Sequence, residues 1–107
     1  MDRILFIINP VAGGGKAKKL LPVIDKYMVK TGKIYDIVLT SRPKEATIIS
    51  KQAIEKGYTT IVAVGGDGTI NEVAIGILES GKGTLGIIPR GTGNDLARTL
   101  NIPFDPI

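Results

Sequence analysis

The chain has 107 residues, of which 43% are hydrophobic and 14 are glycine, and its formal net charge is +4; this length suits one domain. The absence of cysteine and histidine from the sequence excludes disulfide bonds, thiolate metal sites and histidine-based acid–base catalysis. Because the sequence has neither a membrane-spanning apolar run nor a signal-peptide pattern, we expect a cytoplasmic protein.

Positive charge is concentrated in the N-terminal half. Residues 1–57 carry 11 Lys or Arg and 5 Asp or Glu, whereas residues 58–107 carry 3 and 5. This asymmetry indicates phosphate ligands or an anionic membrane surface, but lysines such as Lys26 and Lys30 would equally suit the solvated face of a helix. With only 2 Phe and 3 Tyr, the chain lacks the interleaved aromatic residues of a single-stranded nucleic-acid binder, so we expect no nucleic-acid partner.

Strand-like and helix-like patterns alternate along the whole chain. The apolar runs at 3–9, 34–40, 59–65 and 84–89 predict strands. Helical spacing predicts helices that end at Gly32, Gly57 and Gly81, and a short last helix over 94–100. The second helix is expected to open at residues 41–43. This alternation predicts an α/β fold, an open parallel sheet with helices on both faces (Rossmann-like), and leaves the strand order undetermined.

Glycine-rich turns follow three of these strands, at residues 10–15, 65–68 and 90–93. All of them are therefore expected at the carboxyl edge of the sheet, where open α/β folds bind ligands. Two familiar phosphate motifs do not fit. Residues 13–17 resemble the end of a P-loop, but Ala17 stands where a metal-binding Ser or Thr is needed, and the dinucleotide pattern at residues 81–86 enters a strand instead of leaving one.

The sequence repeats a Gly-Thr-x-Asn-acid pattern at residues 68–72 and 91–95. In each copy the threonine, Thr69 or Thr92, and the acid three residues later predict a capping box. If Thr69 caps its helix, Asp67 stands on a loop of glycines whose N–H groups suit a phosphate. Asp67 is then expected to bind Mg²⁺ through water or to position a phosphate-accepting hydroxyl; a plain turn aspartate is the structural alternative.

These motifs together resemble the diacylglycerol kinase catalytic domain family, which includes bacterial lipid kinases and sphingosine kinases. The resemblance is carried by "GGDGTINEV" and "LGIIPRGTGNDLARTLNIP", with "IINPVAGGGKA" and "LTSRPKEA" before them. NAD kinases and phosphofructokinases share the Gly-Gly-Asp-Gly motif more distantly. The resemblance implies ATP-dependent phosphorylation of a lipid hydroxyl with Mg²⁺, and an N-terminal domain of the kind found in NAD kinases and diacylglycerol kinases.

The family pattern also implies roles for single residues. It makes Asp67 the essential catalytic acid. It places at the nucleotide Asn9, Pro10, Val11, Ala12, Gly13, Thr40, Gly65, Gly66, Asp67, Gly68, Thr69, Ile70, Asn71 and Thr92. In the family, the segment that contains Asn94, Asp95 and Arg98 has two alternative roles. It either contacts the substrate or has a structural or interdomain role. No metal ligand is assigned within this chain.

Family members continue into a second, mostly β domain that supplies much of the lipid pocket, the general base and part of the metal site. We expect that domain to be missing here, so that residues 1–107 fold alone and bind ATP weakly without transferring phosphate. The expected partners are a lipid substrate at the inner face of the membrane and the missing C-terminal domain; a homo-oligomer is compatible with the sequence. Two alternatives stay open, an NAD kinase and a non-catalytic nucleotide-binding regulatory domain.

Overall fold

In the computed structural model, residues 2–11 and 14–89 are described. They form strands and helices that alternate as the sequence predicts. The elements are β1 (Arg3–Ile8), α1 (Lys16–Lys19), α2 (Leu21–Thr31), β2 (Ile34–Leu39), α3 (Glu45–Glu55), β3 (Thr60–Gly65), α4 (Asp67–Ser80) and β4 (Thr84–Pro89). The predicted helix over 94–100 lies outside the described residues.

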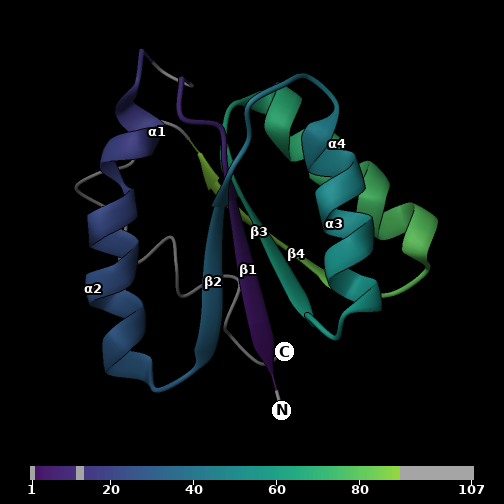
Figure 1. Cartoon of the computed structure of the whole chain (residues 1–107), viewed down its shortest axis with the longest axis horizontal. Helices are drawn as coiled ribbons and strands as arrows, with labels where there is room; N and C mark the ends of the chain where they lie inside the picture. Colours follow the sequence, from purple (N-terminus) through teal and green to yellow (C-terminus); the bar gives the residue numbers. More distant parts are fainter. Residues whose placement is uncertain (1, 12–13, 90–107) are drawn as a thin grey trace.

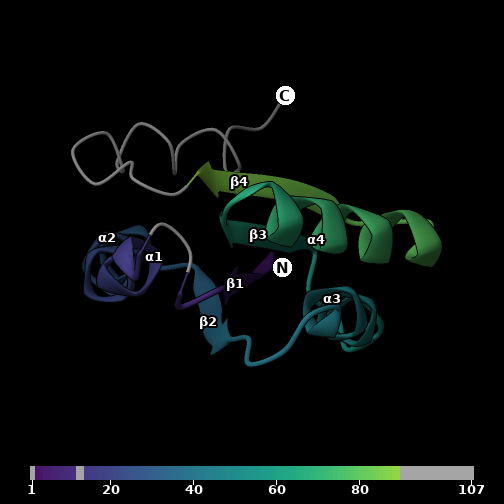
Figure 2. The same ribbon diagram turned by 90° about the horizontal axis from the view of Figure 1, so that it is seen from above.

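The four described strands form one parallel sheet in the order β2-β1-β3-β4. Helices α1 and α2 cover one face of the sheet, and α3 and α4 cover the other (Figure 1). The view from above shows the same layers, with the sheet running between the two pairs of helices (Figure 2). The predicted fold class, an open parallel sheet with helices on both faces, is therefore confirmed.

The two central strands are buried on both sides, as their nearly continuous apolar sequences predict. Along β1, alternate side chains enter two separate cores. Ile4, Phe6 and Ile8 pack against α1 and α2, whereas Leu5 and Ile7 pack against α3 and α4. Burial of β1 and β3 fixes the middle of the sheet, and hence the place where their C-terminal ends meet.

The second helix begins later than the sequence suggested. It was expected to open at residues 41–43, but α3 begins at Glu45, and Lys44 precedes it in the left-handed conformation with φ 68°. Pro43 explains part of the shift, because a proline disfavours the helical conformation of the residue before it. As a result, residues 41–44 form a connecting segment at the carboxyl edge of the sheet.

No described helix combines the length and the apolar character needed to cross a membrane.

Candidate nucleotide-binding site

The site begins where β1 and β3 end side by side. Ile8 is paired with Val64 in the parallel register, and the Asn9 amide donates a hydrogen bond of 3.1 Å to the Val64 carbonyl oxygen. From this point the chain leaves β1 toward α1 and leaves β3 toward α4, on opposite faces of the sheet (Figure 1). Such a reversal between neighbouring parallel strands creates the crevice in which α/β proteins bind ligands.

The end of β2 closes the crevice on one side. The Thr40 amide donates a hydrogen bond of 2.9 Å to the Ile8 carbonyl oxygen, and the Thr40 hydroxyl lies 3.4 Å from the same oxygen. Directly after β1, the Asn9 side-chain oxygen accepts a hydrogen bond of 3.2 Å from the Val11 amide. This local bond is an Asx-type turn, which directs the chain away from the sheet after Pro10.

A cleft of about 510 Å³ occupies this edge of the sheet. Its volume lies in the range of roughly 300–1,000 Å³ that is typical of small-molecule sites. Six of its lining residues were predicted from the sequence: Asn9, Pro10, Val11, Thr40, Gly68 and Thr69. The structure therefore brings together residues from three separate βα connections.

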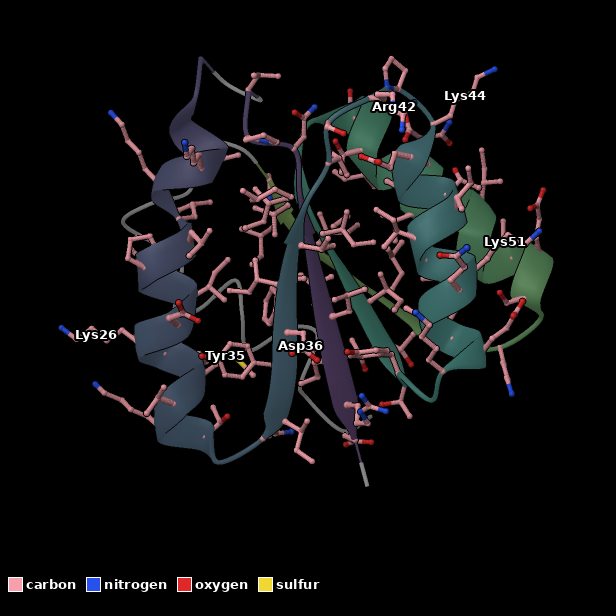
Figure 3. All side chains as sticks on the ribbon, in the orientation of Figure 1. Lys26, Tyr35, Asp36, Arg42, Lys44 and Lys51 are labelled. Carbon is pink, nitrogen blue, oxygen red and sulfur yellow. The ribbon has the colours of Figure 1, made fainter. Side chains whose placement is uncertain are left out.

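The cleft is also lined by five residues that the sequence did not identify as site residues: Ser41, Arg42, Pro43, Ala46 and Glu72. Figure 3 shows Arg42 on the segment that leads into α3, at the same end of the molecule as the first turn of α4. The signal was present in the sequence, because Ser41 and Arg42 directly follow the predicted contact Thr40. They were missed because this segment was expected to be helical.

The start of α4 corrects the predicted capping box. The helix begins at Asp67, its N-cap is Gly66, and no side chain caps it. The Ile70 amide already bonds the Gly66 carbonyl oxygen at 3.1 Å. Thr69 is only 7% exposed and lies within the first turn, so the prediction that Thr69 and Glu72 form a cap was wrong. Gly66 takes an extended conformation, so the helix starts before Thr69 and not after it. The Glu72 side chain is then not needed for capping, and Glu72 lines the cleft.

Asp67 is consequently placed differently from the expectation of an acid on a loop. It is an exposed residue in the first turn of α4. An acid at this position is favoured by the partial positive charge of a helix N-terminus. Gly65 ends β3 and Gly66 precedes the helix, so residues 65–71 form a strand end and a helix start instead of a continuous loop.

The predicted residues of α4 line two hollows on different sides of its first turns. Gly68 and Thr69 face the cleft described above. A second, open hollow of about 590 Å³ is lined by Asp67, Gly68, Ile70, Asn71 and Ala74. Gly68 lines both, and a Cβ atom at this position would meet no other atom within 4 Å. The backbone of the first turn of α4 is therefore accessible from both hollows.

Within residues 2–11 and 14–89, no three Asp or Glu side chains lie close enough together to hold a metal ion. Six predicted residues lie outside the described part of the chain, and their positions stay predictions: Ala12, Gly13, Thr92, Asn94, Asp95 and Arg98.

Comparison with known proteins agrees with these features. The sequence is 40% identical over 104 residues to the diacylglycerol kinase of Staphylococcus carnosus, covering 96% of this chain and 34% of that protein. It is also 40% identical over 100 residues to the diacylglycerol kinase of Staphylococcus haemolyticus, covering 92% and 30%. The chain thus spans about a third of the length of these relatives.

A solved structure gives the same result for the fold. The crystal structure of a diacylglycerol kinase from Bacillus anthracis superimposes with a TM-score of 0.73 and 32% sequence identity, over 97% of this chain and 38% of that one. The diacylglycerol kinase catalytic domain is matched by residues 3–107. With its glycine-flanked acid at the start of α4 and its cleft at the strand ends, the chain belongs to the diacylglycerol kinase catalytic domain family.

Proposed function

We propose that this chain is the nucleotide-binding part of an ATP-dependent kinase that phosphorylates a hydroxyl group of diacylglycerol or a related lipid. The observation that carries the proposal is the cleft at the ends of β1 and β3, into which Asn9, Thr40 and Gly68 converge from three βα connections. Membership of the family supports kinase chemistry.

The cleft suits the nucleoside, and the start of α4 suits the phosphates. Asn9, Thr40 and Glu72 offer hydrogen-bonding groups beside the apolar surfaces of Pro10 and Val11. The N-terminal turn of α4 adds backbone N–H groups and the positive end of the helix dipole, which attract phosphate. Because Gly68 has no side chain, a phosphate can approach this backbone closely.

Asp67 fits a Mg²⁺ ion bound together with the nucleotide. Magnesium usually takes one or two carboxylates from the protein and completes its shell with water and substrate phosphates. One exposed carboxylate beside the phosphate-binding turn meets this requirement. The ion would neutralise charge on the transferred phosphoryl group. By holding this ion, the Asp67 carboxylate would keep the phosphates in place without contacting them directly.

Phosphoryl transfer also requires a group that accepts the proton of the attacking lipid hydroxyl. We place this general base and the remaining metal ligands in the part of the longer protein that follows residue 107. On this proposal residues 1–107 alone bind ATP weakly and do not transfer phosphate.

The outer face of α1 and α2 supports a membrane location for the reaction. Lys18, Lys19, Lys26 and Lys30 are exposed there, and Lys26 points away from the sheet (Figure 3). Lysines near an anionic membrane each contribute about 1 kcal/mol of attraction. We therefore place the enzyme in the cytoplasm, in peripheral contact with the inner face of the membrane.

The proposal is tested with the full-length protein that contains this chain. It is incubated with labelled Mg-ATP and either diacylglycerol in vesicles or NAD. Transfer to diacylglycerol alone supports the proposal, transfer to NAD identifies an NAD kinase, and nucleotide binding without transfer to either identifies a regulatory domain. Turnover by residues 1–107 alone would contradict the location of the base.

A further inference from the structure

The segment between β2 and α3 forms one wall of the cleft and is held by the side chain of a glutamate. Glu45, the first residue of α3, accepts a hydrogen bond of 2.6 Å from the Ser41 amide. The same carboxylate oxygen accepts a second bond of 3.2 Å from the Ser41 hydroxyl. Both donors belong to a residue that lines the cleft.

The charge of this carboxylate matters to the arrangement. Hydrogen bonding from the Ser41 amide is the main cause that lowers the pKa of Glu45, and the Ser41 hydroxyl and the positive charge of Arg42 lower it further. Glu45 is therefore ionised at neutral pH, and its bonds to Ser41 are charge-assisted, which makes them stronger than bonds between neutral groups.

The backbone beside this contact is held in a conformation that it would otherwise avoid. Lys44 has φ 68°, and a residue with a side chain adopts this left-handed region only when its surroundings impose it. A long bond of 3.4 Å from the Glu45 amide to the Arg42 carbonyl oxygen adds a weaker restraint on the same turn. The Glu45 carboxylate is thus the strongest described restraint on residues 41–44.

From these contacts we infer that Glu45 is a positioning residue for the nucleotide: by binding Ser41 it holds the segment of Ser41 and Arg42 against the cleft. Glu45 does not line the cleft, so it acts through the residues it restrains. This inference rests on the proposed function, because it assigns the cleft to the nucleotide.

Removing the carboxylate is expected to weaken nucleotide binding without impairing the chemical step. In the full-length protein, Glu45→Ala should raise the dissociation constant of Mg-ATP about five- to tenfold, as expected for loss of a charge-assisted hydrogen bond. KM for ATP should rise by a similar factor, while kcat at saturating ATP should stay within about twofold of the wild type, since binding of the ground state and of the transition state is weakened equally.

Two further variants separate positioning from a general effect on the helix. Glu45→Gln keeps an oxygen that can accept from Ser41 and should restore part of the lost affinity. Glu55→Ala is the matched control, because Glu55 is an exposed glutamate at the opposite end of the same helix; it should bind Mg-ATP as the wild type does. Thermal unfolding of all three variants checks that they are folded.

The outcomes distinguish this inference from the proposed function. If the wild-type protein does not bind Mg-ATP, the proposed function fails and the inference fails with it. If the wild type binds Mg-ATP but Glu45→Ala binds equally well, the inference alone is overturned. Faster hydrogen exchange at the Ser41 amide in Glu45→Ala, together with weaker ATP binding, supports it.

Discussion

The Thr47 hydroxyl of α3 donates a hydrogen bond of 2.8 Å to the main-chain carbonyl oxygen of Glu72 in α4. This bond joins the two helices whose first turns border the cleft. Gly76 of α4 lies against Thr47 and Ser50 of α3, and a Cβ atom at Gly76 would lie 3.1 Å from the Ser50 Cβ, so the two helices approach each other closely here. This contact between α3 and α4 therefore lies beside the part of the cleft that Ala46 and Glu72 line.

Gly76 should be the least replaceable glycine of α4. A Cβ atom there would collide with the Ser50 Oγ and lie 2.7 Å from the Thr47 carbonyl oxygen. Gly76→Ala should therefore lower the free energy of unfolding by about 1–3 kcal/mol, the usual cost of overpacking. Chemical denaturation measures the change. In Gly68→Ala the added methyl group has open space, so this control should be as stable as the wild type or more so; equal losses in both variants would contradict the close crossing.

Asp67→Ala should abolish most activity while the fold persists. The carboxylate is exposed in the first turn of α4, so its loss should cost no more than about 1 kcal/mol of helix-dipole stabilisation. Turnover of the full-length enzyme should fall by about two orders of magnitude or more. Glu79→Ala, at the other end of the same helix, is the matched control and should retain turnover. Near-normal activity of Asp67→Ala would make this residue a plain helix-start aspartate.

A larger side chain at residue 68 should block the phosphates without unfolding the domain. Gly68 lines both hollows beside the first turn of α4, and valine there would cover the backbone that the phosphates are proposed to approach. Gly68→Val should weaken Mg-ATP binding by at least about tenfold, equivalent to ~1.4 kcal/mol. Isothermal titration calorimetry gives the affinity, and circular dichroism checks the fold. Unchanged affinity would place the phosphates elsewhere.

Two tyrosines should make the domain sensitive to alkaline pH. The Tyr58 hydroxyl donates to the Asp36 carboxylate, and the Tyr35 hydroxyl donates to Asp25 at 2.8 Å. These hydrogen bonds are the main cause that raises the pKa of Tyr58 and of Tyr35. A folded-state pKa above the unfolded value of about 10 means that the stabilisation is fully present below pH ~10 and is lost as the pH rises through the raised value.

Absorbance titration of the phenolates tests this prediction. Tyr58→Phe and Tyr35→Phe should each remove one high-pH transition and flatten the stability profile above pH ~10. Asp36→Asn, which removes the charged acceptor, should return the Tyr58 transition toward lower pH. If Asp36→Asn leaves the titration curve unchanged, the hydrogen bond is not the cause of the raised pKa.

The ion pair between Lys51 and Glu79 should matter little. The Lys51 Nζ and Glu79 Oε1 atoms are 3.2 Å apart, and the two side chains are 43% and 50% exposed. Exposed pairs of this kind contribute about 0–1 kcal/mol. Lys51→Ala should therefore change the free energy of unfolding by less than Gly76→Ala does, and high salt should reduce the change further. A loss above ~1 kcal/mol would show that Lys51 stabilises the α3–α4 contact by packing.

The alternation of elements followed from local patterns. The apolar runs of β1 and β3 and the apolar stripe of α4 are visible in the sequence, because side chains that face a core recur at the period of a strand or a helix. Gly32 and Gly81 end their helices in the left-handed conformation that glycine favours. Helix starts were harder to predict. The Thr-x-x-Glu pattern at Thr69 fits a capping box, but α4 has Gly66 as its N-cap and so begins three residues earlier than that pattern requires.

Short-range spacing and motifs were sufficient to predict the fold class, the family and six of the residues that line the cleft. The strand order β2-β1-β3-β4, which places the ends of β1 and β3 together, became known from the folded structure. The folded structure also brought Ser41, Arg42 and Glu72 to the cleft. These positions depend on contacts between residues far apart in the chain, and no local pattern specifies which strand ends become neighbours.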